Sequence, residues 1–401
     1  MSAPTAPTIP DEVLRIARRL DEAGHEVWCV GGAVRDALLG HPVADFDLAT
    51  SARPEEVQAL FPRRTVAVGL RHGTVGVLDR DRGLHEVTTF RHDVETDGRH
   101  AVVAWGATLE EDLARRDFTI NAIAFHPLRG EWRDPFDGAS DLAARLLRAV
   151  GEPAQRFRED YLRILRALRF AARFDLRIEP ATWEAARAEI DGLVRLSAER
   201  VRDEWLKGLR TALRVERLVT LWHESGAAAR WLPELLPTEE IGAPAALARL
   251  EASGTERDPI LLTMLLARDP VAVLRRLRAS NAEIDRAAAV AAAPPAPLGE
   301  GDEAVRRWLA AAGPAADDLL ALHRLRHGDE APWAHAVSAV RGRGDPLGRK
   351  DLAVGGADLR ALGVPAGPEM GRILDRLLDD VLADPALNER ERLLARAREL
   401  L

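Results

Sequence analysis

The amino-acid pattern changes near residue 140, and this change limits the folds open to the chain. Before it, short apolar runs rich in β-branched residues alternate with glycines, as at 27–30, 65–68, 74–78 and 85–90. Such runs predict strands. After it, Leu, Ala and Arg at helical spacing dominate to the C-terminus. The sequence therefore predicts an α+β protein, with a small mixed sheet and helices in a head, followed by an all-α neck, body and tail.

Turn-rich and proline-rich segments suggest where these parts meet. The string DPFDG at 134–138 precedes the helical region, and AAAPPAPLGEG at 291–301 cannot form one continuous helix. We expect a catalytic head over 1–140, a helical neck over 141–210, a helical body over 211–290 and a helical tail over 291–401. With 47% hydrophobic residues among 401, each part can bury a core.

The cellular setting is constrained by cysteine usage and hydropathy. The chain has one cysteine, Cys29, which cannot form an internal disulfide and stands in an apolar run. We expect it to be buried, and a reducing cytoplasm fits best. No run of about 18 apolar residues occurs, so we expect no membrane span.

Charge is distributed unevenly along the chain. The net charge of −8 does not indicate a nucleic-acid partner, yet nine arginines stand against four acids between Arg145 and Arg177. Such a stretch is either a solvated helix face or a surface that binds phosphate or RNA. Composition alone favours the solvated face.

Two acids, Asp45 and Asp47, form the first chemically suggestive cluster. On a strand they share one face, about 6–7 Å apart at Cα. Adjacent carboxylates repel each other unless a cation lies between them. A pair of Mg²⁺ ions would satisfy both and would clamp an in-line displacement at phosphorus. Two ordinary surface acids are the alternative.

A glycine turn precedes the two acids. Gly31 and Gly32 follow an apolar run and open a helical pattern that contains Arg35. Backbone N–H groups at such a turn can hold a phosphate, and the arginine adds a bidentate donor. The G-x-G-x-x-G spacing of dinucleotide-binding proteins is missing, which argues against a nicotinamide-dependent enzyme. A phosphate turn followed by paired carboxylates is typical of nucleotidyl transfer.

The string VGGAVRDALLG…ADFDLATSA, from Val30 to Ala52, resembles the signature of the class II tRNA nucleotidyltransferase and bacterial poly(A) polymerase family. Further blocks follow in the family's order: GLRHGTVGV (69–77), EVTTFR (86–91), LEEDLARRDFTINAIA (109–124), DPFDG, EDYLRILRALRF (159–170) and ERVRDEWLKGL (199–209). The resemblance covers about residues 26–210.

This resemblance implies a role for each group of residues. Asp45 and Asp47 would hold the catalytic Mg²⁺. The triphosphate would lie against Gly31, Gly32 and Arg35. Arg116 and Asp117 would contact the sugar or base of the nucleotide. Asn121 would support the turn after Asp117. Glu86 is either a third metal carboxylate or a structural acid.

Asp160 and Arg163 are expected to select the nucleotide. At i and i+3 of one helix they would be neighbours, with Asp supplying only acceptors and Arg only donors. Cytosine and adenine both present an amino donor beside a ring-nitrogen acceptor, whereas guanine and uracil present a carbonyl there. The pair would accept C and A and reject G and U. Arg166 and Arg169 continue the stripe, where they would reach phosphates or rigidify the pair. A surface ion pair is the alternative.

The implied function is template-independent addition of CCA to tRNA 3′ ends from CTP and ATP. The RNA 3′-OH attacks the α-phosphate with two metals bound, and pyrophosphate leaves. CC-adding, A-adding and poly(A)-adding enzymes are the sibling alternatives; the form His72-Gly73-Thr74-Val75 is closer to CCA-adding enzymes. A non-catalytic RNA-binding protein is the alternative from another class, but it predicts a broken carboxylate pair or phosphate turn. The sequence does not reveal the oligomeric state.

Overall fold

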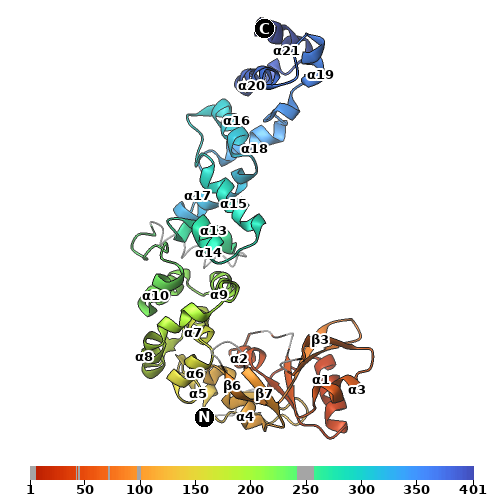
Figure 1. The fold of residues 1–401 in the computed structure, drawn as a ribbon, viewed down its shortest axis with the longest axis vertical. Helices are drawn as coiled ribbons and strands as arrows, with labels where there is room; N and C mark the ends of the chain where they lie inside the picture. The colour runs from red at the N-terminus through yellow and green to blue at the C-terminus, as the bar shows by residue number, and fades with distance from the viewer. Residues whose placement is uncertain (1–5, 42, 44–45, 71–72, 97–100, 242–256) are drawn as a thin grey trace. The chain divides into compact units, whose positions relative to one another are not determined.

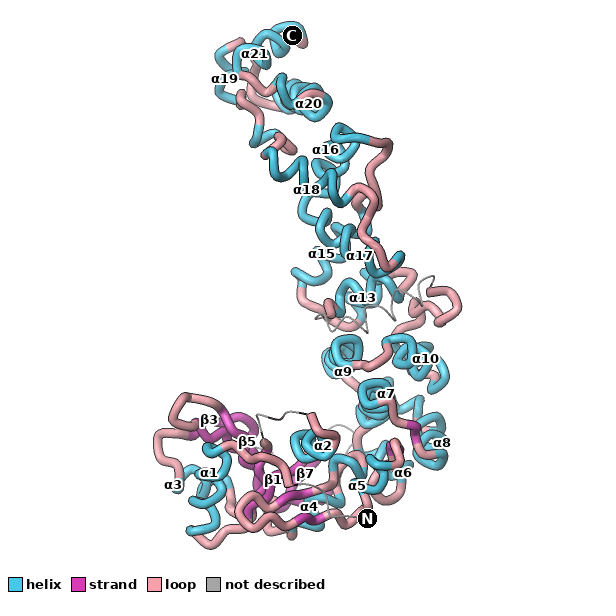
Figure 2. Tube along the Cα trace, turned by 180° about the vertical axis from the view of Figure 1, so that it is seen from behind, coloured by secondary structure: helices cyan, strands magenta, loops and turns pink. Residues whose placement is uncertain are grey.

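The structure, a computed structural model, describes residues 6–41, 43, 46–70, 73–96, 101–241 and 257–401, with side chains of 92–104 excepted. It divides into two compact units, residues 1–237 and 238–401. Strands, magenta in Figure 2, occur only in the first unit among the described residues. Asp45, His72 and residues 242–256 lie outside the described part.

The head is built on a seven-stranded mixed sheet (Figure 1). From edge to edge its strands are β3 (Thr65–Gly69), β4 (Thr74–Leu78), β5 (Leu84–Thr89), β2 (Asp47–Thr50), β1 (Val27–Val30), β8 (Ala124–Phe125) and β9 (Trp132–Arg133). Strands β2 and β5 pair in parallel, and the other neighbours are antiparallel. The predicted mixed sheet is confirmed.

Beside the seven-stranded sheet, β6 (Arg91–Thr96) and β7 (Ala101–Trp105) pair antiparallel in a separate two-stranded sheet. The helical elements of the head are α1 (Asp11–Glu22), α2 (Gly32–Leu38), α3 (Pro54–Leu60), α4 (Leu109–Ala114), η2 (Thr119–Asn121) and α5 (Gly138–Ala143). The amphipathic pattern of α1 buries Val13, Ile16, Ala17 and Leu20 on one face.

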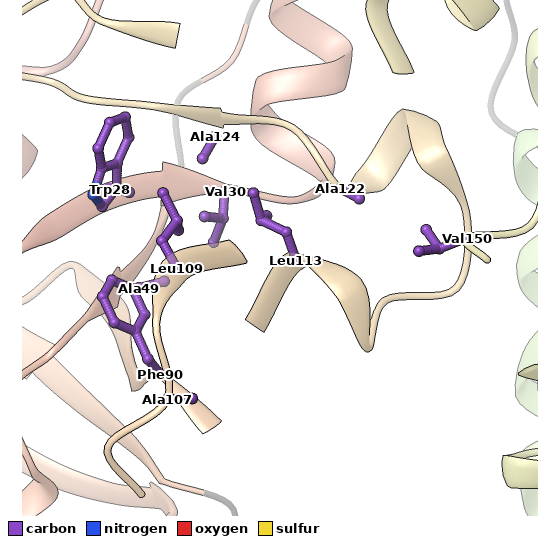
Figure 3. Packing of buried hydrophobic residues seen from close by; sticks show 10 residues of the cluster. All are labelled: Trp28, Val30, Ala49, Phe90, Ala107, Leu109, Leu113, Ala122, Ala124 and Val150. Atoms are coloured by element: carbon purple, nitrogen blue, oxygen red, sulfur yellow. The ribbon is translucent and has the colours of Figure 1, made fainter. Parts of the chain in front are cut away.

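One core cluster joins α4 to the central strands. Leu109 and Leu113 of α4 belong to the same buried cluster as Trp28 and Val30 of β1 (Figure 3). Thr108 caps α4, because its hydroxyl accepts the Glu111 N–H at 3.2 Å. This packing fixes the C-terminal end of α4, where Arg115 and Arg116 follow. Cys29 of β1 is buried as expected, and burial, with the charge of Asp47, raises the pKa of its thiol.

The rest of the first unit is almost wholly helical. Its elements are β10 (Leu146–Leu147), α6 (Pro153–Glu159), α7 (Leu162–Phe174), β11 (Arg177–Ile178), α8 (Pro180–Ala188), η3 (Ile190–Arg195), α9 (Ala198–Thr211), α10 (Val215–Ser225) and α11 (Ala227–Trp231). The parallel pair β10–β11 departs from the all-helical expectation. Each strand has two residues, too few to give a periodic signal. Trp205 and Trp222 pack edge to face in the core, with ring centroids 5.2 Å apart.

The second unit contains only helices among its described residues. They are α13 (Pro259–Leu266), α14 (Pro270–Arg276), α15 (Asn281–Ala292), α16 (Gly301–Ala312), η4 (Gly313–Ala315), α17 (Ala316–His327), α18 (Ala334–Arg343), η5 (Arg349–Asp351), α19 (Gly356–Ala361), α20 (Pro368–Ala383), η6 (Pro385–Leu387) and α21 (Arg390–Glu399). Within the described ranges, no helix combines the length and hydropathy that crossing a membrane requires.

Candidate active site

A pocket of about 700 Å³ opens between the head sheet and helices α7 and α9 of the same unit. Among the described residues that line it, ten are basic and five are acidic. The basic ones are Arg35, Arg91, Arg115, Arg116, Arg163, Arg166, Arg169, Arg173, Arg200 and Lys207. This excess of positive charge suits a polyanionic ligand such as a nucleoside triphosphate.

The pocket brings together every described residue singled out from the sequence as a site residue. These are Gly31, Gly32, Arg35, Asp47, Arg116, Asp117, Asp160, Arg163, Arg166 and Arg169. Asp45, the remaining one, lies outside the described residues. Glu86 and Asn121, for which the sequence left the role open, line the same pocket.

Asp47 and Glu86 occupy neighbouring strands. The parallel register pairs Leu48 of β2 with Val87 of β5, so Asp47 and Glu86 each stand one residue before a paired position. Leu48 and Val87 are buried and the two acids are exposed, so both carboxylates face away from the core. Carboxylate oxygens are the ligands that Mg²⁺ prefers. No described group of three or more acids, histidines or cysteines lies close enough together to hold a metal.

Gly31 allows the chain to pass close to Arg116. Its φ of +75° is a conformation that L side chains rarely adopt. A Cβ there would also stand 3.2 Å from Arg116 Nη1 and 3.9 Å from Asp47 Oδ2. The glycine turn therefore borders directly on the predicted metal carboxylate and on the predicted nucleotide-binding arginine.

Arg35 has its guanidinium engaged by protein groups. The side chain is buried, and Nε donates to Asp36 Oδ1 at 2.8 Å while Nη1 donates to Asn121 Oδ1 at 2.5 Å. The guanidinium carbon also lies 5.1 Å and 4.5 Å from the ring centroids of Phe170 and Phe174. Burial lowers the pKa of Arg35, although the neighbouring Asp36 opposes this effect. Arg35 thus ties α2 to η2 and α7 at the pocket wall.

Arg116 is held by a buried acid at the end of α4. Asp112 is 1% exposed and accepts from Arg116 Nη2 at 3.1 Å and from Arg115 Nη2 at 2.8 Å. Burial would raise the pKa of Asp112, but the charges of Arg115 and Arg116 and their hydrogen bonds hold it below its ordinary value. Arg116 Nε is buried and has no hydrogen-bond partner within the described part of the chain.

Asp117 is the centre of a network that joins three elements. Its Oδ1 accepts from the Phe118 N–H at 2.8 Å and from Asn121 Nδ2 at 2.9 Å, and its Oδ2 accepts from Arg166 Nε at 2.7 Å. Burial would raise the pKa of Asp117, but the charge of Arg166 and these hydrogen bonds lower it below its ordinary value. Asp117 therefore stays ionised and orients Arg166 from α7.

Arg169 is anchored by Glu204 of α9. Its side chain is 2% exposed, and Nε donates to Glu204 Oε2 at 2.6 Å. Arg166 Nη1 lies 4.0 Å from Glu204 Oε1. The arginine stripe on α7 is consequently fixed from both sides, by Asp117 of the head and by Glu204 of α9.

Asp160 and Arg163 do not lie on one helix, and this part of the sequence prediction is wrong. Asp160 is the extended residue between α6 and α7, with φ −155° and ψ 104°. The physical reason is the preference of Asp for helix starts: its Oδ1 accepts the Leu162 N–H at 3.1 Å and its carbonyl accepts the Arg163 N–H at 3.0 Å. Both side chains nevertheless line the pocket.

Each of the two side chains is bound by another partner. Asp160 Oδ2 accepts from Arg200 Nη2 at 2.8 Å. Arg163 Nη1 donates to Glu159 Oε2 at 2.7 Å and to the Arg156 carbonyl at 2.8 Å, and its Nη2 donates to the Arg115 carbonyl at 2.9 Å. These bonds use three of the five N–H donors of Arg163.

Three residues of α9, at the pocket or beside it, have no role predicted from the sequence. Arg200 and Lys207 line the pocket from α9, and Glu204 of the same helix anchors Arg169. Burial lowers the pKa of Lys207, and the nearby charge of Arg169 adds to this effect. All three lie in the block ERVRDEWLKGL, so the resemblance contained a signal for them, but no local pattern showed what they contact.

Comparisons with known proteins agree with this geometry. The family model described as the poly A polymerase head domain matches residues 27–148. The model described as the probable RNA and SrmB-binding site of polymerase A matches residues 175–238. The two matched ranges contain the sheet, α4, α9 and the glycine turn, and α6 and α7 lie between them.

Whole-chain comparisons extend the likeness to both units. The CCA-adding enzyme of Geobacillus stearothermophilus is 36% identical over 394 residues, 96% of this chain and 95% of that protein. The CCA-adding enzyme of Streptococcus pyogenes is 48% identical over 209 residues, 52% of this chain and 51% of that protein. A crystal structure of the Bacillus stearothermophilus CCA-adding enzyme in complex with CTP has a TM-score of 0.78 and 35% identity, covering 100% of this chain and 98% of that one.

Proposed function

This chain belongs to the family of CCA-adding enzymes, and we propose that it adds C, C and A to the 3′ end of tRNA, using CTP and ATP and releasing pyrophosphate. The observation that supports this most is the single pocket shared by the ten described residues singled out from the sequence. The RNA 3′-OH attacks the α-phosphate of the bound nucleotide, and the pyrophosphate takes the bonding electrons as it leaves. The proposed setting is the cytoplasm, because the proposed substrate is tRNA.

The basic wall of the pocket supports binding of the triphosphate. Gly31, Gly32 and Arg35 are proposed to face it, with Arg35 also holding α2 against α7 through Phe170 and Phe174. Because guanidinium groups keep their charge, they neutralise the phosphates throughout the reaction. Binding energy gathered here positions the α-phosphate for attack.

Enzymes of this family generally depend on a divalent metal, and we propose Mg²⁺ for this one. Asp47 would hold it together with Asp45, and Glu86 is placed to contribute a further carboxylate oxygen. These oxygen donors fit a hard cation. When bound, the metal would supply positive charge at the attacking and leaving oxygens.

Base selection is assigned to Asp160 and Arg163. A carboxylate accepts from the amino group of cytosine or adenine, and a guanidinium donates to the adjacent ring nitrogen. The carbonyl of uracil or guanine would face the Asp160 carboxylate without a donor between them, which costs about 1–3 kcal/mol. No nucleic-acid template is needed.

The remaining site residues are proposed to hold the nucleotide and this selecting pair in place. Arg116 and Asp117 would meet the sugar or base. Arg166 and Arg169 are fixed by Asp117 and Glu204, so they provide rigid walls for the bound nucleotide. Selective binding requires that the side chains in direct contact with the ligand are held rigidly.

Residues 141–401 are proposed to hold the tRNA. They would form a neck, a body and a tail, with boundaries near residues 210 and 290. A-form RNA offers phosphates and 2′-hydroxyls rather than readable base edges, so shape and charge are the expected means of recognition. An experiment must separate this function from four alternatives. Three are the sibling activities of CC-adding, A-adding and poly(A)-adding enzymes, and the fourth is a non-catalytic RNA-binding protein.

A single-nucleotide gel assay tests the proposal. The substrates are tRNAs that end before CCA, after C or after CC, given Mg²⁺ with CTP, ATP or both. Stepwise addition of C, C and A that then stops is the expected result. Stopping after CC, extension of only the CC-ended tRNA, or long A tails on any RNA would each assign a sibling activity. No incorporation by folded protein would favour the non-catalytic alternative.

A further inference from the structure

The Asp160 carboxylate is held at both oxygens. Oδ1 accepts from the Leu162 N–H at 3.1 Å, at the start of α7, and Oδ2 accepts from Arg200 Nη2 at 2.8 Å, from α9. The two bonds come from different elements, so together they set the orientation of the carboxylate plane. Each carboxylate oxygen has two acceptor sites, so a carboxylate held in this way can still accept a hydrogen bond from a ligand.

Arg200 keeps this contact despite an unfavourable environment. The side chain is 30% exposed, yet its Nη1 is buried and has no hydrogen-bond partner in the described part of the chain. A buried donor without an acceptor costs free energy, and such groups call for an explanation beyond ordinary packing. An exposed surface ion pair would not require that cost.

The backbone at Asp160 is fixed as well. The next residue, Tyr161, is buried, and its ring lies against Gly192 of η3. A Cβ at Gly192 would lie 1.9 Å from Tyr161 Cε1, so no other residue leaves room for the ring. The Arg195 guanidinium covers the same ring at 5.5 Å. Element η3 therefore fixes the backbone next to Asp160, while α9 fixes the carboxylate.

We propose that Arg200 is a positioning residue that determines nucleotide specificity, by holding the Asp160 carboxylate as a fixed acceptor at the pairing edge of the incoming base. This inference rests on the proposed function. A fixed acceptor rewards the amino group of cytosine or adenine and opposes the carbonyl of uracil or guanine. Without Arg200, the carboxylate can turn away from a carbonyl at little cost, so kcat/KM for UTP should fall less than kcat/KM for CTP.

The test compares single-nucleotide incorporation of CTP, ATP and UTP by the wild type and by Arg200→Met, which keeps an unbranched apolar stem and removes the charge and donors of the side chain. We expect kcat/KM for CTP to fall roughly 10- to 100-fold, the cost of a misplaced contact. The CTP-to-UTP ratio of kcat/KM should narrow at least about tenfold. Arg200→Lys, which keeps a point charge, should restore part of that ratio.

Arg202→Ala is the matched control, because Arg202 lies on the same helix, pairs with Asp203 and is not among the described residues that line the pocket. It should keep the wild-type ratio. A folded Arg200→Met enzyme with wild-type discrimination would overturn the inference. If Arg200→Met does not fold, Arg200→Gln takes its place under the same criterion. A wild type that incorporates neither CTP nor ATP would overturn the proposed function itself, a result distinct from an unchanged ratio.

Discussion

Asp117 and Arg166 stand 49 positions apart in the sequence, and Arg166 Nη2 lies 2.6 Å from Asp117 Oδ2. The pair connects the head to α7 at the wall of the pocket. Asp117 is 8% exposed, so its ionised carboxylate depends on Arg166 and on the hydrogen bonds around it. This contact therefore contributes to the stability of the first unit and makes that stability depend on pH.

Asp117→Asn should destabilise the protein at pH 7 by about 1–3 kcal/mol, because Arg166 loses a charged partner. The pKa of Asp117 is lowered in the folded state, so its contribution is present above the ordinary carboxyl pKa and is lost as the pH falls through the folded pKa. The variant should thus lose less stability than the wild type below about pH 4. Urea unfolding followed by tryptophan fluorescence at several pH values measures this. Asp203→Asn, at an exposed acid, should keep the wild-type profile.

Asp47→Asn should lower nucleotide incorporation at least about 100-fold, because an amide oxygen replaces a carboxylate ligand of the proposed Mg²⁺. Folding, by circular dichroism, and tRNA binding, by filter retention, should be unchanged. Removing divalent ions with EDTA should abolish wild-type incorporation, and added Mg²⁺ should restore it. Asp81→Asn changes an exposed acid outside the described pocket lining and should behave as wild type. Full activity of Asp47→Asn would refute the metal role.

Glu204→Gln should destabilise the protein by about 3–5 kcal/mol, because it leaves the nearly inaccessible Arg169 without its anion. Arginine cannot relieve this by losing its proton. The double variant Glu204→Gln, Arg169→Met should recover part of the loss, since no buried cation remains. Denaturant unfolding of both single variants and the double variant gives the interaction free energy between Glu204 and Arg169. Strictly additive losses would show that the pair contributes no interaction of its own.

Gly192→Ala should lower stability by about 1–3 kcal/mol, because the new methyl group overlaps the Tyr161 ring. Thermal unfolding measures this loss of stability. The CTP-to-UTP ratio of kcat/KM should also narrow, because the backbone next to Asp160 shifts. The control is Gly342→Ala in α18, where an added Cβ meets nothing within 4 Å. There, replacing a helical glycine should stabilise the helix by up to about 1 kcal/mol. Equal effects at the two glycines would contradict the close packing inferred at Gly192.

Much of the fold was accessible from the sequence because its signals are local. The buried run at β1 and the amphipathic period of α1 are written within a few neighbouring residues. The pocket residues were also recoverable, since the family blocks carry them in order. The two-residue strands β10 and β11 were missed, because their pairing is set by the surrounding helices rather than by any alternation of their own.

Partners between distant elements were the part that the sequence could not show. Helical spacing suggested Asp160 and Arg163 as mutual neighbours, but a helix start intervenes between them. Their charged partners are Arg200, 40 positions beyond Asp160, and Glu159, four positions before Arg163. Spacing along one element says nothing about a second helix that packs across it, and only the fold brings Arg200 to Asp160.

The contacts that run from Arg35 through Asn121, Asp117 and Arg166 to Glu204 bear on how this protein can change over generations. Hydrogen bonds join the first four members, and an ion pair joins Arg166 to Glu204, so a replacement at one position leaves its neighbour with an unmatched group. Substitutions along this series are therefore expected to be tolerated together and rejected singly. In evolutionary terms the pocket wall behaves as one epistatic unit, and altered nucleotide preference should arise more readily through residues at its margin, such as Arg200.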